Sequence, residues 1–257
     1  MRFVKMHGAG NDFVMIDDRD GTFPIDARKI SALAARGTGI GCEGVILVQK
    51  SDRREFRMRF FNPDGSEAEL CGNGARCVAA FAREIGAAKA DTMTFETLAG
   101  DVRAEIVGPE RVKVWMPEPK DLRANFVNSG VPHCIVPVTD VDAADVAGEG
   151  RRIRQSAAFA PDGTNVDFVT YEKPNRVRIR TYERGVEAET GACGTGAVAA
   201  AVVGVAQHGL TFPVTVRTAL GHELEVDGTR EGTAFGSVTL TGPVKRVFEG
   251  ETDKGKS

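Results

Sequence analysis

The chain has 257 residues, of which 42% are hydrophobic and 27% are charged, as expected for a globular protein with a sizeable core. Its 33 basic and 36 acidic residues give a formal net charge of -3, which offers no broad electrostatic surface to nucleic acid or to an anionic membrane. No run is apolar and long enough for a secretory signal or a membrane span, so we expect a cytoplasmic protein with neither kind of partner.

Short runs of alternating apolar and polar residues dominate the first half of the chain and predict strands. The runs cover residues 2–6, 56–61, 93–97, 101–107 and 111–116. A helix is expected over residues 26–36, and a second begins at Cys71, where "CGNGARCVAAFA" opens with glycines and continues in good helix formers. Two prolines within residues 115–122 break the strand pattern and predict a boundary between two domains, residues 1–117 and 118–257.

The second half of the chain has the same pattern. Strands are predicted over residues 177–182, 214–218, 222–228 and 236–242, with a short helix near residues 149–156. From Cys193, "CGTGAVAAAVVGVA" predicts a helix that is apolar on most of its faces and must therefore be buried. We expect an α+β fold in which each half is a strand-rich, barrel-like shell around one central helix. The last strand or the tail is expected to pack back on the N-terminal half.

An internal repeat with one offset relates the two halves. The two cysteine turns are 193 − 71 = 122 residues apart, and the same offset pairs Gly8 with Gly130 and Val14 with Val136. It also places "GCEGVILV" over "GTNVDFVT". A Glu-Ala-Glu tripeptide recurs shortly before each cysteine, here at an offset of 187 − 67 = 120. Because these matches follow one another in the same order, they predict two homologous, pseudo-symmetric halves.

Each repeated cysteine is expected at a helix N-terminus, where several backbone N–H groups lack an intrahelical partner and the helix dipole is positive. Such a place stabilises an anion. The anion can be the cysteine thiolate, whose pKa falls there, or the carboxylate of a ligand that approaches the glycine-led turn. For one motif alone, a glycine-bracketed helix start with a small buried cysteine remains the alternative. If the two halves face one another across a cleft, however, the two thiols form an opposed acid/base pair.

Two opposed acid/base groups suit the inversion of a stereocentre, because one removes a proton and the other returns a proton to the opposite face. The negative charge that develops next to a carboxylate needs electrostatic stabilisation, which two helix N-termini supply without metal or cofactor. The five cysteines show no zinc-ligand spacing, and there is no pyridoxal-phosphate, P-loop or dinucleotide-binding pattern. We therefore expect a racemase or epimerase with no cofactor and no metal. The remaining cysteines, Cys42, Cys77 and Cys134, are interpreted as small buried hydrophobes.

Six segments of the chain, taken in order, resemble one known family. They are "HGAGNDF" from His7, "FNPDGSEAELCGNGARC" from Phe61, "VPH" from Val131, "GTNVDF" from Gly163, "YERGVEAETGACGTGA" from Tyr182 and "GPV" from Gly242. Over nearly the whole chain they are similar to the diaminopimelate epimerase family. The resemblance implies a cofactor-independent, homodimeric isomerase that interconverts LL- and meso-2,6-diaminopimelate in lysine and peptidoglycan synthesis. It also implies that Cys71 and Cys193 are the catalytic pair, one a thiolate and the other a thiol.

The resemblance further implies which residues bind the small amino-acid substrate. They are Asn11, Asn62, Gly72, Asn73, Asn165, Glu183, Arg184, Gly194 and Thr195. His133 and Glu183 are implied as residues that shift the pKa values of the thiols. Arginine is a natural fork for a carboxylate, and asparagine both donates and accepts hydrogen bonds. The alternative for each asparagine alone is a turn residue that satisfies the backbone, and for His133 it is a core histidine.

Two positions depart from the family pattern. Val131 stands where a member can have a substrate-binding asparagine, and Gly44 where a glutamine can bind. Two other interpretations stay open: a proline racemase or hydroxyproline epimerase of the same fold, and a non-catalytic thiol protein that senses redox state or binds an anion. The segments "MHGAGNDF" and "YERG" favour the diaminopimelate epimerase family over the proline enzymes.

Overall fold

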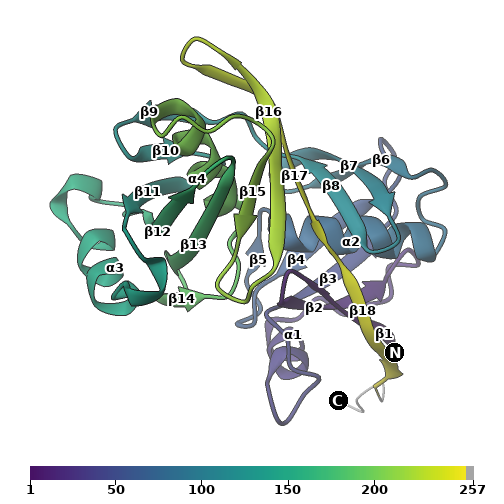
Figure 1. The fold of residues 1–257 in the computed structure, drawn as a ribbon. Helices are drawn as coiled ribbons and strands as arrows, with labels where there is room; N and C mark the ends of the chain where they lie inside the picture. The colour runs from purple at the N-terminus through teal and green to yellow at the C-terminus, as the bar shows by residue number, and fades with distance from the viewer. Residues whose placement is uncertain (253–257) are drawn as a thin grey trace. The chain divides into compact units, whose positions relative to one another are not determined.

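The computed structural model describes residues 1–252. The chain divides into two compact units: unit 1 is Met1–Val114 together with the segment that begins at Pro243, and unit 2 is Trp115–Gly242. In each unit, strands surround one central helix (Figure 1). No helix within residues 1–252 has the length and apolar character that crossing a membrane requires.

Unit 1 is a strand-rich sheet packed around helix α2. Its elements are β1 (Arg2–Gly8), β2 (Asn11–Asp17), α1 (Ala27–Ala34), β3 (Gly44–Gln49), β4 (Arg57–Phe61), β5 (Glu67–Ala68), α2 (Gly72–Glu84), β6 (Thr92–Thr97), β7 (Gly100–Gly108), β8 (Arg111–Trp115) and β18 (Lys245–Glu251). The strands follow the order β18, β1, β2, β3, β4, β6, β7, β8, with β5 paired to the end of β4. The pairs β2/β3 and β4/β6 are parallel, and the others are antiparallel.

Unit 2 is built in the same way around helix α4. Its elements are β9 (Lys120–Arg123), β10 (Phe126–Asn128), β11 (Pro132–Pro137), η1 (Val141–Ala143), α3 (Val146–Arg154), η2 (Ala157–Phe159), β12 (Asn165–Glu172), β13 (Arg176–Glu183), β14 (Ala188–Thr190), α4 (Gly194–Gln207), β15 (Val214–Arg217), β16 (Glu223–Glu231) and β17 (Ala234–Pro243). The strand order is β9, β10, β11, β12, β13, β15, β16, β17, with β14 paired to the end of β13. The pairs β11/β12 and β13/β15 are parallel.

The two units therefore share one pattern of strand pairing. Strands β1 to β8 correspond to β10 to β17, helix α1 corresponds to α3, and α2 corresponds to α4. Helix α2 begins at Gly72 and α4 at Gly194, while β6 begins at Thr92 and β15 at Val214, so both pairs keep the predicted offset. The predicted α+β fold of two pseudo-symmetric halves is confirmed.

The central helices form the core of each unit because their side chains are small and apolar. Helix α2 packs against β1, β2, β3 and β7, and α4 packs against strands from β10 to β16. Every residue of α4 from Ala197 to Val205 is buried, as the all-round apolar sequence predicts. Gly74 of α2 packs closely against β3, since an added Cβ would lie 2.9 Å from Cδ1 of Ile46.

The C-terminal strand belongs to the first unit. Strand β18 pairs antiparallel with β1, from Arg2 opposite Glu251 to His7 opposite Lys245. Unit 2 therefore ends at Gly242, whereas the predicted second domain runs to residue 257. Residues 253–257, which belong to the predicted tail, lie outside the described residues.

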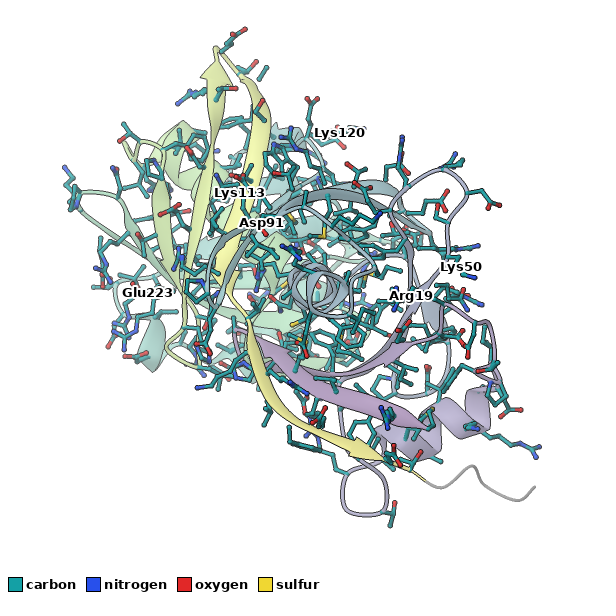
Figure 2. All side chains as sticks on the ribbon, turned by 90° about the vertical axis from the view of Figure 1, so that its right-hand side faces the viewer. Arg19, Lys50, Asp91, Lys113, Lys120 and Glu223 are labelled. Carbon is teal, nitrogen blue, oxygen red and sulfur yellow. The ribbon has the colours of Figure 1, made fainter. Side chains whose placement is uncertain are left out.

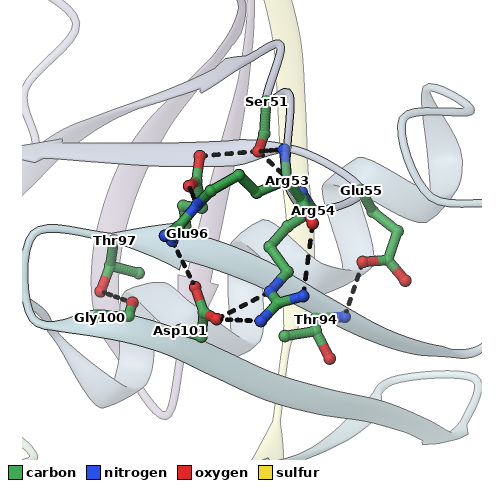
Figure 3. Close-up of polar contacts among 9 residues, drawn as sticks. All are labelled: Ser51, Arg53, Arg54, Glu55, Thr94, Glu96, Thr97, Gly100 and Asp101. Carbon is green, nitrogen blue, oxygen red and sulfur yellow. Dashed lines mark hydrogen bonds and ion pairs between the residues drawn. The ribbon is translucent and has the colours of Figure 1, made fainter.

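Three of the four arginines in residues 52–60 pair with neighbouring carboxylates. Arg53 Nε lies 2.6 Å from Glu96 Oε1, and Arg54 Nη2 lies 2.5 Å from Asp101 Oδ2, which ties this loop to the β6–β7 hairpin (Figure 3). Arg59, on β4, pairs with Glu67. The stretch is therefore no continuous basic patch, although other charged side chains, among them Lys50, Lys120 and Glu223, are exposed at the surface (Figure 2).

Candidate active site

Cys71 occupies the N-cap position of α2. Its backbone is extended, with φ -126° and ψ 121°, and its carbonyl accepts a helical hydrogen bond from the Ala75 N–H at 2.7 Å. The thiol donates to Asn11 Oδ1 at 3.5 Å. Gly8 of β1 permits the close approach of this helix end, because a Cβ there would lie 2.8 Å from the carbonyl oxygen of Asn73. The thiol thus lies at the positive end of the central helix.

Cys193 occupies the equivalent N-cap position of α4. Its φ is -113° and its ψ is 115°, and its carbonyl accepts from the Ala197 N–H at 3.0 Å. The sulfur accepts a hydrogen bond from the Gly196 N–H at 3.4 Å and lies 3.4 Å from Thr195 Oγ1. Both cysteines are partly buried, and each begins the central helix of its own unit.

An ordered chain of hydrogen bonds surrounds Cys71. Arg76 Nη2 donates to Asn73 Oδ1 at 2.7 Å, which turns the amide nitrogen of Asn73 toward Asn11 Oδ1 at 3.4 Å. The amide nitrogen of Asn11 in turn donates to a carboxylate oxygen of Glu43. Because a guanidinium only donates and a carboxylate only accepts, the two ends of the chain fix the orientation of both amides.

Arg76 is a fully buried cation in the first turns of α2. It also donates from Nη1 to the Gly72 carbonyl at 3.3 Å, while its Nε has no hydrogen-bond partner within residues 1–252. Burial lowers the pKa of this guanidinium to about 10, and negative charge on Cys77 or Cys71 acts in the opposite direction. The helix end that carries Cys71 therefore has a positive side chain beside its positive dipole.

A different chain of polar groups leads to Cys193. His133 Nδ1 lies 2.6 Å from Asp167 Oδ2, and His133 Nε2 lies 2.9 Å from Thr195 Oγ1, which contacts the cysteine sulfur. His133 and Asp167 are both 0% exposed. The carboxylate approaches the helix closely because residue 196 is glycine: a Cβ there would lie 2.6 Å from Asp167 Oδ1. Asp167, His133, Thr195 and Cys193 thus form one connected path.

The surroundings of Cys193 favour its protonated form. Burial raises the pKa of the Cys193 thiol well above its ordinary value, and the negative charges of Glu183 and Asp167 raise it further. A hydrogen bond from the Gly196 N–H acts in the opposite sense. The two cysteines therefore have unlike environments: a buried cation lies near Cys71, whereas carboxylates lie near Cys193.

The other three cysteines lie away from the helix ends. Cys42 and Cys77 are buried, and Cys134 is partly buried. Burial raises the pKa of Cys77 to about 12 and that of Cys134 to about 11, and it also raises the pKa of Cys42. These thiols are poor bases and poor nucleophiles at neutral pH.

Among the other predicted site residues, Asn165 and Arg184 are joined by hydrogen bonds to the path of polar groups that leads to Cys193. Asn165 Oδ1 accepts from the Arg184 N–H at 2.7 Å, and the Asn165 amide nitrogen lies 3.4 Å from His133 Nε2. Arg184 follows Glu183, the last residue of β13, so both stand at the same strand end. This end of unit 2 brings together most of the residues that were predicted there.

Asn62 lies in the turn that follows β4. Its amide nitrogen donates to Ser66 Oγ at 3.1 Å, and its carbonyl accepts from Gly65 in the turn after β4. These are the contacts of a turn residue. Gly44, one of the two departures from the family pattern, has no room for a longer side chain, because a Cβ there would lie 3.1 Å from the Phe61 carbonyl oxygen.

Three residues of these networks were not predicted from the sequence: Glu43, Arg76 and Asp167. Asp167 had a usable signal, because it lies two residues after Asn165 on a strand, and such residues share a face of the sheet. Arg76 also had one, as a lone charge among the small apolar residues that begin a buried helix. Glu43 had none, because it reaches Asn11 through tertiary contact alone.

Within residues 1–252, no cluster of His, Cys, Asp and Glu side chains has the composition of a metal site. A cavity of about 1050 Å³ lies within unit 1, where Met1, Phe3, Asp18, Phe23 and Phe81 contribute to its wall. None of the predicted site residues lines it, and the residues of α2 that line it lie toward the C-terminal end of that helix.

Comparison with curated proteins found diaminopimelate epimerases among the relatives of this chain. A family model described as diaminopimelate epimerase matches residues 3–121 and 125–247. The chain is 44% identical to a diaminopimelate epimerase of Aquifex aeolicus, with 97% of each chain covered. It is 40% identical to a diaminopimelate epimerase of Chlorobaculum tepidum, with 95% of this chain and 98% of the relative covered.

Comparison with solved structures found the same fold at low sequence identity. A PhzF-family phenazine biosynthesis protein of Bacillus anthracis is 17% identical, with a TM-score of 0.76 and 98% of each chain covered. A probable proline racemase of Agrobacterium radiobacter is 18% identical, with a TM-score of 0.72 and coverage of 99% of this chain and 93% of that one. These structures establish the fold alone.

Proposed function

Because the chain belongs to the diaminopimelate epimerase family, we propose that it interconverts LL- and meso-2,6-diaminopimelate with Cys71 and Cys193 as its acid/base pair. The chain is an isomerase that acts on an amino acid. In the proposed reaction one thiolate removes the proton from the α-carbon, and the other cysteine, as a thiol, delivers a proton to the opposite face. In the reverse direction the two cysteines exchange roles.

One observation carries the proposal: each of the two repeated units places a cysteine at the N-cap of its buried central helix. A proton next to a carboxylate is very weakly acidic, so the reaction needs stabilisation of the negative charge that develops. Unpaired N–H groups at a helix N-terminus provide it, and the glycines beside each cysteine allow a carboxylate to approach the backbone.

We further propose that the substrate is bound by Asn11, Asn62, Gly72, Asn73, Asn165, Glu183, Arg184, Gly194 and Thr195. The contacts of Asn11 and Asn73 around Cys71, and of Asn165 and Thr195 around Cys193, support this set. Asn62 has the weakest support, because its described side-chain bond is within a turn. His133 and Glu183 are proposed to tune the Cys193 thiol, through Thr195 and through charge.

The test is a solvent-exchange assay on two substrates. Purified protein in D2O is incubated with LL-diaminopimelate and, separately, with L-proline, and the products are examined by NMR and chiral chromatography. We expect meso-diaminopimelate with deuterium at the inverted α-carbon, and no change in proline. Turnover of proline alone would overturn the proposal in favour of the proline enzymes, which share the fold but are only 18% identical to this chain.

We also propose that the protein is a cytoplasmic homodimer. The family resemblance supports both statements, and the exposure of Val247 and Phe248 on β18, 54% and 47%, supports a surface that a second copy would cover. Light scattering on a size-exclusion column is expected to give the mass of two chains. A single-chain mass at micromolar concentration would contradict the dimer and leave the proposed activity untouched.

A further inference from the structure

The hydrogen positions in the hydrogen-bonded path from Asp167 to Cys193 can be assigned by starting at the Asp167 carboxylate. The Asp167 carboxylate only accepts, and it contacts the Thr181 hydroxyl at 2.7 Å through Oδ1 and His133 Nδ1 at 2.6 Å through Oδ2. His133 therefore carries a proton on Nδ1. A buried carboxylate that receives two hydrogen bonds in this way holds the imidazole in one orientation.

A second contact assigns the other ring nitrogen. The Arg184 N–H fixes the oxygen of the Asn165 amide, so the amide nitrogen, a donor, faces His133 Nε2 at 3.4 Å. A proton on Nε2 would oppose this donor, so Nε2 is an acceptor. The Thr195 hydroxyl, at 2.9 Å, then donates its one hydrogen to Nε2.

The state of Cys193 follows from that assignment. With its hydrogen directed at His133, Thr195 Oγ1 presents only lone pairs to Cys193 Sγ at 3.4 Å. A thiol can donate its hydrogen to this oxygen, whereas a thiolate would face the lone pairs of another atom. The Gly196 N–H, at 3.4 Å, occupies one lone pair of the sulfur and leaves the S–H free to point at Thr195.

We propose that Asp167 is a positioning residue that acts through His133 and Thr195 to hold Cys193 as the thiol, so that Cys193 enters the reaction as the proton donor. The inference rests on the proposed function of the cysteine pair and adds what holds Cys193 as a thiol in the free protein. The charged and titratable groups that face Cys193 are Glu183 from β13, Asp167 from β12 and, through Thr195, His133 from β11. Helix α4 has no charged residue.

Asp167→Asn is expected to reverse the direction of the hydrogen bonds that run from residue 167 through His133 and Thr195 to Cys193. An amide at position 167 can donate to His133 Nδ1, so the imidazole proton moves to Nε2, which then donates to Thr195 and turns the Thr195 hydrogen toward the sulfur. We expect the midpoint of Cys193 ionisation to fall by about one pH unit or more, which makes its alkylation below the midpoint about tenfold faster. Loss of the carboxylate charge acts in the same direction.

The experiment is site-resolved alkylation of the full-length protein with iodoacetamide over a pH series, read by peptide mass spectrometry. Cys71 is the internal reference, since it belongs to the other unit. Thr181→Val is the matched control, because it removes the other hydrogen bond to Asp167 and leaves the path through His133 intact. Its Cys193 midpoint should shift far less than that of Asp167→Asn. An unchanged midpoint in folded Asp167→Asn protein overturns the proposal.

A double-mutant cycle separates the effect of the hydrogen bonds through Thr195 from the effect of the Asp167 charge alone. The shift caused by Asp167→Asn should shrink in a Thr195→Val background and return with Thr195→Ser, which keeps the hydroxyl. An equal shift in all three backgrounds means that the charge acts alone, and the proposal is wrong. If Asp167→Asn does not fold, Thr195→Val in the native background still decides. A lowered Cys193 midpoint supports the proposal, because the thiol loses its acceptor, whereas an unchanged or raised midpoint contradicts it.

Failure of this inference and failure of the proposed function give different results. Cys193→Ala, assayed for epimerisation beside the alkylation series, tests the function alone. If that variant loses turnover while Asp167→Asn leaves the midpoint unchanged, the positioning role of Asp167 is wrong and the two-cysteine reaction stands. If Cys193→Ala keeps turnover, the proposed function is wrong whatever the alkylation shows.

Discussion

Cys71→Ala and Cys193→Ala are each expected to lower the rate of diaminopimelate epimerisation by about a thousandfold or more, since a positioned acid or base contributes about 10²- to 10⁴-fold and each reaction direction needs both. Inversion requires loss of a proton on one face and gain on the other, and alanine can do neither. The measurement is the rate of meso product from LL substrate, together with circular dichroism of each variant to show that the fold persists.

The matched control for these variants is Cys42→Ala. Cys42 is buried in a hydrophobic cluster of unit 1 and takes no part in the networks at the helix ends. Its replacement should lower the free energy of unfolding by about 1 kcal/mol, as a small loss of core volume does, and leave the turnover number near that of the native protein. Near-native inversion in either Cys71→Ala or Cys193→Ala would show that a two-base reaction between these thiols is wrong.

The position of the two cysteines could be predicted from the sequence because its causes are local. A cysteine followed by Gly-x-Gly and then by alanine-rich sequence begins a helix wherever it occurs, and the offset between Cys71 and Cys193 revealed the repeat. The central helices α2 and α4 are buried because they have few polar side chains. None of these steps needs the tertiary contacts, so the α+β shells and the first residues of their helices could be predicted from the sequence.

The partners of the cysteines could not be predicted in the same way because they depend on tertiary register. His133 reaches Asn165 because β11 and β12 are parallel neighbours with these two residues opposite one another. Asn11 reaches Glu43 across a similar junction of β2 and β3. The sequence shows each residue in a plausible turn or strand, but only the register decides which side chains meet.

The repeat itself explains why the two cysteines differ. The offset of 122 that pairs Cys71 with Cys193 also pairs Asn73 with Thr195 and Asn11 with His133. The backbone positions are equivalent, but the side chains around Cys71 are amides joined to a buried guanidinium, whereas those around Cys193 are an imidazole and carboxylates. A reaction that needs one acid and one base at a time is served by this divergence, since identical surroundings would give both thiols the same tendency to ionise.

Arg76→Met is expected to separate activity from stability. Arg76 orients Asn73 through a 2.7 Å hydrogen bond and donates to the Gly72 carbonyl, so its loss frees the turn that follows Cys71. A misplacement of about 1 Å at such a site costs about a hundredfold in rate, and we expect a loss of kcat/KM of this size. The melting temperature should stay the same or rise, because methionine fills similar volume without burying a charge whose Nε has no partner in the described part of the chain.

Arg83→Met on the same helix is the matched control, since Arg83 is solvent-exposed and its ion pair within residues 1–252 is with Asp91 at 3.1 Å. Removal of such a surface pair should change stability by no more than about 1 kcal/mol and leave kcat/KM unchanged. Native activity in Arg76→Met would show that Asn73 keeps its orientation without the guanidinium. A large loss of stability that accompanies the loss of activity would assign Arg76 a structural role. A buried cation whose role is only to orient Asn73 should lower the stability of the fold and contribute nothing to it.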